Sequence, residues 1–135
     1  MPEAHLYLGA IALVMSVLRP RRIPWRLSRR VGWPLVISGL TIAAWATHSA
    51  GQTDLASPNR VVTDGPYAMS RHPMYVAWTT IYVGVACVTR RAWLLLLTPL
   101  LVVLIRREIE REEERLTELL GPAYTAYRTR VRRYL

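Results

Sequence analysis

The sequence predicts an all-α integral membrane protein with about four transmembrane helices, a charged C-terminal cytoplasmic helix and a short amphipathic tail helix. The chain has 135 residues, 52% of them hydrophobic, and these gather in four blocks without acidic or arginine side chains. The blocks are apolar all round, and a soluble chain this short could not bury four such cylinders. Arginine and tryptophan residues lie near the block ends, where a membrane interface favours them.

The four blocks define the expected order of the helices, which are Ala4–Leu18, Val31–Ala50, Met74–Thr89 and Ala92–Ile105. Spanning a bilayer takes roughly 20 apolar residues, so only the second block is comfortably long enough. The fourth has 14 residues, and arginines at its ends would have to reach the interface. We divide the chain into an N-terminal transmembrane helix pair (1–50) and a C-terminal core (51–135), within one structural domain overall.

The basic charge of the chain leaves two topologies open. All 18 basic residues are arginine and the net charge is +9. Six arginines lie between the first two blocks and eight follow the fourth, and the positive-inside rule favours the cytoplasm for both groups. Four full spans would place the two groups on opposite sides. Either the first group is external, or one block does not cross completely.

A polar segment, Asp64–Tyr75, precedes the third block. Asp64-Gly-Pro is a turn signal, and Pro73 suits the first position of a helix. Arg71 and His72 would then lie at a helix N-terminus, which favours an anionic ligand group. The alternative is that both residues anchor the helix at the lipid headgroups.

A charged helix is expected from Ile105 to Leu120, ending at Gly121-Pro122. At 100° per residue, Glu112 falls about 20° from Ile105, inside an apolar stripe, and Glu113 falls about 80° away, on its edge. A carboxylate in such a stripe requires a cation or a hydrogen-bond donor. Glu112 therefore forms either a structural salt bridge or a ligand contact.

The arginine-rich tail carries Tyr124 and Tyr127 at helical spacing. This pattern is typical of a helix on anionic headgroups, so we expect membrane lipids as partners and no nucleic acid. The histidines lack ligand-like spacing and Cys87 is the only cysteine, so no metal site is expected.

Taken in order, these motifs resemble the isoprenylcysteine carboxyl methyltransferase (ICMT) family, whose wider group includes phospholipid methyltransferases. The resemblance covers Gly65-Pro-Tyr67, Arg71-His-Pro-x-Tyr75, a hydrophobic stretch, Glu112-Glu113 and Gly121-x-x-Tyr124-x-x-Tyr127. One departure is Ala77, where the family usually has glycine.

The resemblance implies an S-adenosylmethionine-dependent methyltransferase in the bacterial inner membrane, with its cofactor site facing the cytoplasm. The implied cofactor-binding residues are Tyr67, Arg71, His72, Pro73, Tyr75, Glu112 and Glu113, with Tyr124 and Tyr127 as a lid. Arg71 would orient a carboxylate or thiolate acceptor, whereas an amine or thiol would need His72 or Glu113 as a base. Arg71 and Glu113 are thus the expected catalytic residues, and the acceptor is a lipophilic or small molecule.

Two other classes compete with the methyltransferase. One is a membrane reductase of the sterol-reductase type, which would bind NADPH. The other is a non-catalytic small membrane scaffold, which would bind neither cofactor.

Overall fold

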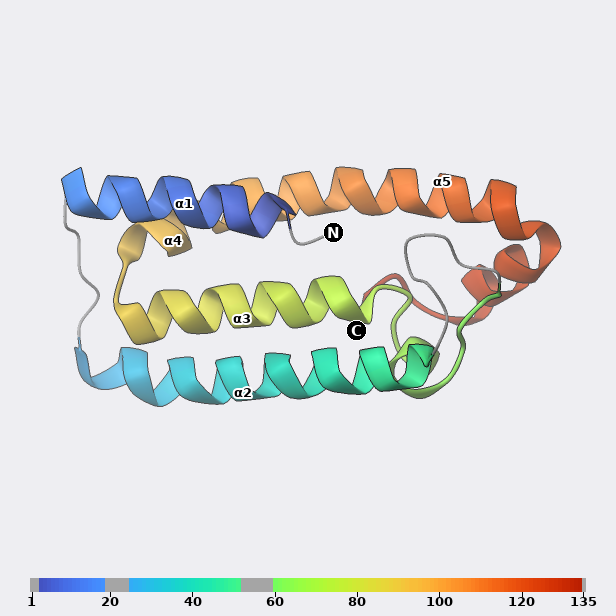
Figure 1. Cartoon of the computed structure of the whole chain (residues 1–135), viewed down its shortest axis with the longest axis horizontal. Coiled ribbons are helices and arrows are strands. Elements are labelled where there is room, and N and C mark those ends of the chain that lie inside the picture. Colours follow the sequence, from blue (N-terminus) through green and yellow to red (C-terminus); the bar gives the residue numbers. More distant parts are fainter. Residues whose placement is uncertain (1–2, 19–24, 52–59, 135) are drawn as a thin grey trace.

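The computed structural model describes residues 3–18, 25–51 and 60–134. Over these ranges the chain is all-helical, which confirms the predicted α class, and the long helices lie side by side along one axis (Figure 1). The elements are α1 (Glu3–Leu18), α2 (Trp25–Ala50), the 3₁₀ helix η1 (Gly65–Ala68), α3 (Pro73–Thr89), α4 (Ala92–Leu96) and α5 (Thr98–Arg130).

The limits of α3 follow from local chemistry. Pro73 opens the helix, since its fixed φ suits a first turn whose N–H groups have no partner within the helix. Arg90 ends it in the left-handed conformation, with φ of 60°, and its backbone N–H reaches the carbonyls of Ala86 and Cys87. The helix therefore matches the third apolar block.

The fourth apolar block is not one helix, and the prediction was wrong on this point. The chain forms the short α4, breaks at Leu97 and continues as α5, which runs past Ile105 into the charged segment. Pro99 explains the break, because it has no N–H to continue the hydrogen bonding of α4 and prefers the first turn of a new helix.

Within the described ranges, no helix combines the length and the apolar character that crossing a bilayer requires.

Helix α2 packs along α3 at close range (Figure 1). A Cβ atom on Gly39 would lie 2.6 Å from Ile81 Cγ1, and one on Gly84 would lie 2.7 Å from Val36 Cγ2. Neither space admits a side chain without movement of the neighbouring helix. These two glycines therefore set the α2–α3 distance.

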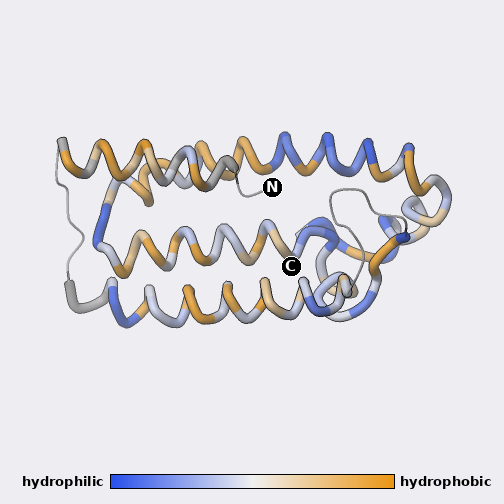
Figure 2. Tube along the Cα trace, in the orientation of Figure 1, coloured by the Kyte–Doolittle hydropathy of each residue, from blue (hydrophilic) through white to orange (hydrophobic). Residues whose placement is uncertain are grey.

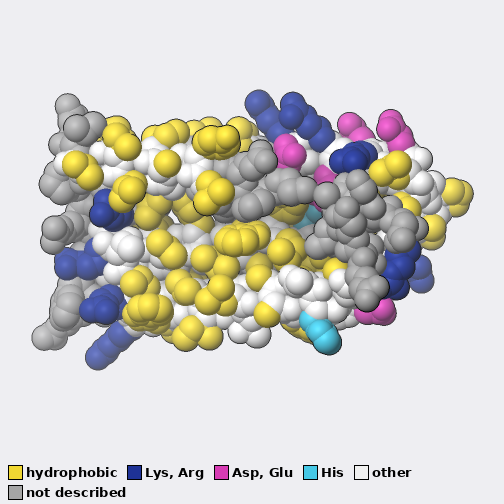
Figure 3. All heavy atoms as spheres, viewed as in Figure 1, with side chains coloured by type: hydrophobic (Ala, Val, Ile, Leu, Met, Phe, Trp, Pro, Cys, Tyr) yellow, Lys and Arg dark blue, Asp and Glu magenta, His cyan; other side chains and the backbone are white. Residues whose placement is uncertain are grey.

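The main core lies between α1, α3, α4 and α5. Leu101 and Ile109 are fully buried there, and the Tyr82 hydroxyl donates to the Leu94 carbonyl at 3.0 Å. The first turns of α5 are apolar, a hydrophilic stretch follows, and the part around the bend is mixed (Figure 2). In Figure 3, hydrophobic side chains cover much of the bundle, and acidic side chains gather toward the end where α5 bends. Acidic side chains are thus concentrated at one end of the described bundle, whereas arginine side chains lie at both ends (Figure 3).

Candidate active site

A kink in α5 brings distant parts of the chain together. Gly121 interrupts the helix with φ of 53° and ψ of −130°, a combination that suits glycine, which confirms the predicted end of the charged helix. After the kink the chain turns back, and the Tyr127 hydroxyl donates to the Tyr67 carbonyl at 2.6 Å. The last turns of α5 therefore lie against η1 and the start of α3.

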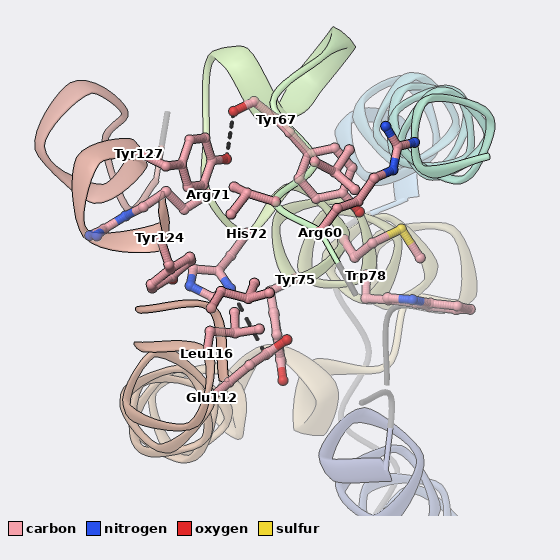
Figure 4. A pocket seen from close by; sticks show the side chains of 14 residues that line it. Arg60, Tyr67, Arg71, His72, Tyr75, Trp78, Glu112, Leu116, Tyr124 and Tyr127 are labelled. Carbon is pink, nitrogen blue, oxygen red and sulfur yellow. Dashed lines mark hydrogen bonds and ion pairs between the residues drawn. The ribbon is translucent and has the colours of Figure 1, made fainter. Parts of the chain in front are cut away.

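Between these segments lies a pocket of about 180 Å³ (Figure 4). Its wall is formed by the segment before η1, by η1, by the residues leading into α3 and its first turns, by the charged stretch of α5 and by the turns after the kink. The lining residues are Arg60, Val61, Val62, Tyr67, Arg71, His72, Met74, Tyr75, Trp78, Glu112, Leu116, Leu120, Tyr124 and Tyr127. The pocket wall thus combines charged, aromatic and aliphatic side chains.

Beside the pocket, a buried carboxylate joins three basic side chains. Glu113 is only 2% exposed; its Oε1 lies 3.2 Å from Arg71 Nη2 and 3.1 Å from His72 Nε2. Its Oε2 accepts a 2.8 Å hydrogen bond from Arg133 Nη2. Burial alone would raise the pKa of Glu113, but hydrogen bonds from Arg133 and His72 and the charge of Arg71 outweigh it and lower that pKa. The carboxyl group of Glu113 is therefore ionised, and both of its oxygens are held by basic side chains.

His72 is held neutral in the same cluster. Burial lowers its pKa more than the carboxylates of Glu112 and Glu113 raise it. Because a carboxylate only accepts, the bond to Glu113 requires the proton on Nε2 and leaves Nδ1 without one. Nδ1 lies 3.9 Å from Glu112 Oε2, beyond hydrogen-bond distance. His72 therefore offers an unprotonated nitrogen at a pocket-lining position.

Three buried polar atoms have no hydrogen-bond partner among the described residues: Arg71 Nε, Arg71 Nη1 and the Tyr124 hydroxyl. Leaving such groups unsatisfied costs free energy, so native proteins rarely do so without a ligand or water. Burial and the negative charge of Glu113 raise the pKa of Tyr124 to about 12, so its hydroxyl stays protonated and able to donate. A guanidinium nitrogen such as Arg71 Nη1 and the phenol of Tyr124 are donors that suit an anionic group.

The predicted burial of Glu112 and Glu113 was wrong. Glu113 is the buried residue, whereas the side chain of Glu112 is 36% exposed and lines the pocket. The inner face follows every fourth residue through Ile105 and Ile109 to Glu113. Leu119, which at 100° per residue also falls on the side of Ile105, is 57% exposed.

Most residues singled out from the sequence meet at this pocket, and two lie behind its wall. Pro73 is buried at the start of α3, and Glu113 reaches the pocket only through Arg71 and His72. The others form one surface: Tyr67, Arg71, His72, Tyr75, Glu112, Tyr124 and Tyr127.

Sequence analysis missed much of the remaining wall. Arg60, Val61 and Val62 belong to the 51–135 core but were not singled out, and Trp78 was expected only among the tryptophans near the block ends. Helical spacing held one usable signal, since Trp78 lies three residues after Tyr75 and so shares its face.

Residues 27–122 match the phospholipid methyltransferase family. The match covers more than half of the chain, so the chain belongs to this family. The family implies methyltransferase activity in general. The match includes α2 as well as the Arg-His-Pro segment and the acidic pair, and it ends just before Tyr124 and Tyr127. The curated proteins include no match to the chain.

Proposed function

We propose that the protein is a membrane-embedded, S-adenosylmethionine-dependent methyltransferase whose acceptor is a lipophilic or small carboxylate, thiol or amine. The observation that carries this proposal is the group of unpartnered donors, Arg71 Nε, Arg71 Nη1 and the Tyr124 hydroxyl, at a pocket formed by the family's motifs. Of these, Arg71 Nη1 and the Tyr124 hydroxyl suit the carboxylate of the methionine part of the methyl donor.

The rest of the pocket suits the other parts of the donor. The partly exposed carboxylate of Glu112 suits an ammonium group. The aromatic rings of Tyr67, Tyr75 and Trp78 provide flat apolar surfaces for an adenine ring and π faces for a cationic sulfonium. When bound, the donor supplies a methyl group activated by its positive sulfur.

The side chains contribute position more than proton transfer. Methyl transfer from a sulfonium is an in-line displacement, so holding donor and acceptor in line supplies much of the acceleration. Glu113 is a poor base, because its oxygens accept from Arg71, His72 and Arg133 and its pKa is lowered. If the acceptor must lose a proton, the free Nδ1 of His72 is the better candidate.

The proposed membrane location is supported by the distribution of apolar side chains. Large hydrophobic residues remain exposed on several helices, including Leu6, Ile11 and Val17 of α1, Ile37 and Leu40 of α2, and Val102 and Val103 of α5. Monomeric soluble proteins rarely expose apolar surfaces of this extent. We place this surface in the bacterial inner membrane, with lipids as neighbours and the charged pocket end facing the cytoplasm.

The test is calorimetric titration of the purified protein in detergent with S-adenosylhomocysteine, with NADPH run in parallel. Saturable binding of the first compound alone is expected and would justify screening acceptors with radiolabelled methyl donor. Binding of NADPH alone would instead select the reductase. If folded protein bound neither, the scaffold would replace both enzymes.

A matched pair of variants locates the site in the same experiment. Glu112→Gln should weaken S-adenosylhomocysteine binding by about fivefold or more, because it removes the carboxylate proposed for the ammonium group. Glu114→Gln makes the same charge change at an exposed position and should leave affinity unchanged. Equal losses in the two variants would contradict the placement of the donor in this pocket.

A further inference from the structure

The segment after α5 is fastened to the residues that precede α3. The backbone N–H of Arg71 donates to the Arg132 carbonyl at 2.9 Å, and the Ser70 hydroxyl donates to the Arg133 carbonyl at 3.1 Å. Arg133 also points its guanidinium at Glu113, with Nη2 2.8 Å from Oε2 and Nε 3.3 Å from Oε1. Backbone and side-chain contacts thus fix Arg133 relative to Arg71.

The two arginines share Glu113 unequally. Arg133 uses two nitrogens and contacts both carboxylate oxygens, as a bidentate pair does. Arg71 uses only Nη2, at 3.2 Å from Oε1, and its Nε and Nη1 have no partner among the described residues. Because Arg133 occupies Oε2, Arg71 cannot form its own two-point pair with this carboxylate.

Arg133 is shared between two carboxylates. Its Nη1 lies 3.6 Å from Glu110 Oε1, while its Nη2 and Nε contact Glu113. Arg71 is mostly buried, with 9% of its side chain exposed, so its unpartnered donors have little access to solvent and require an acceptor.

We propose that Arg133 is a positioning residue: by holding Glu113 at both oxygens, it restricts Arg71 to a single contact through Nη2 and leaves Nη1 for the carboxylate of the methyl donor. This role rests on the proposed function. Arg133 need not touch the donor, and it acts through Glu113 and Arg71.

The test compares two ligands that differ only in the carboxylate. These are S-adenosylhomocysteine and its decarboxylated analogue, 5′-(3-aminopropylthio)-5′-deoxyadenosine, titrated into detergent-solubilised protein. The wild type should prefer the carboxylated ligand. In Arg133→Gln this preference should fall about tenfold or more, since hydrogen bonds to charged groups are lost, while affinity for the analogue stays the same.

Two further variants make the test specific. Arg132→Gln removes the same charge one residue away, at an exposed side chain whose backbone contact to Arg71 is kept, and it should leave the preference unchanged. Arg133→Lys keeps the charge but replaces the planar fork with one ammonium, so the preference should fall severalfold. If Arg133→Gln does not fold, Arg133→Lys tests the positioning role of Arg133 in its place.

Each outcome has a defined meaning. An equal loss of affinity for both ligands would show a purely structural role for Arg133 and overturn the proposal. An unchanged preference in Arg133→Gln or Arg133→Lys would overturn it as well. If the folded wild type bound neither ligand, the proposed function itself would fail, which is a different result from a variant that loses only selectivity.

Discussion

Replacing Glu113 by Gln is the most direct perturbation of the buried cluster. The change keeps the shape of the side chain and removes its charge, at a point where Arg71, His72 and Arg133 all lie within 3.3 Å. The new amide has one acceptor oxygen for these donors, and its NH₂ group must face at least one of them. Two buried or partly buried guanidinium groups then lose their anion.

The expected cost follows from the burial of the partners. Removing one partner of a buried ion pair typically costs about 3–5 kcal/mol, because the remaining charge is left uncompensated. Arg133 has 28% of its side chain exposed and can turn toward water, so we expect the lower end, about 3 kcal/mol. In a chain of this size each kcal/mol lowers the unfolding midpoint by about 4 °C, which predicts a fall of about 12 °C.

The assay is thermal unfolding in detergent, followed by tryptophan fluorescence. Glu114→Gln is the matched control, because it makes the same charge change on the exposed face of α5 and should shift the midpoint by less than about 2 °C. The double variant Glu113→Gln/Arg133→Gln should lose less stability than the sum of the single variants, by about 1 kcal/mol or more, because each removes the partner of the other. A small shift in Glu113→Gln, or strict additivity in the double variant, would refute the reasoning.

The hydrogen bond between Tyr127 and Tyr67 gives a second prediction. The variant Tyr127→Phe leaves the Tyr67 carbonyl without its 2.6 Å donor, so the free energy of unfolding should fall by about 1–3 kcal/mol. Binding of S-adenosylhomocysteine should weaken severalfold. Melting curves and calorimetry check this against Tyr134→Phe at an exposed position, and identical behaviour of the two variants would contradict it. A third prediction concerns the stability of the protein at acidic pH. Burial lowers the pKa of His72, so below about pH 6.5 the unfolded chain takes up a proton that the folded chain does not, and the free energy of unfolding falls. The lowered pKa of Glu113 removes further stability only below about pH 4.5. Midpoints measured between pH 7.5 and 5.5 should therefore decrease in the wild type and decrease less in His72→Gln, and parallel curves would count against a neutral buried histidine.

The fold could be predicted from the sequence where single segments determine it. Three apolar blocks became α1, α2 and α3, and Gly121-Pro122 marked the kink in α5. The fourth block misled because its composition is uniformly apolar, whereas its backbone is decided by one residue, Pro99. The membrane-spanning arrangement stays a prediction.

The site could be predicted only as an ordered set of motifs. Their residues come from segments that a helical wheel cannot relate to one another. The wheel buried Glu112 because it considered the apolar neighbours on α5 alone. Glu113 is buried instead because Arg71, His72 and Arg133, from two other parts of the chain, compensate its charge there. Such compensation depends on tertiary structure and leaves no periodic signal.

The contacts that complete the pocket also determine when it can form during folding. The Tyr127–Tyr67 bond joins residues 60 positions apart, and the Ser70–Arg133 bond joins residues 63 positions apart. Closing loops of this length costs conformational entropy that only later packing repays, so local helices form before such long-range contacts. The ligand pocket should accordingly be among the last parts of the protein to become ordered. An incompletely folded molecule would contain most of its helices and yet be unable to bind a methyl donor, so helix content by itself is a poor measure of active protein.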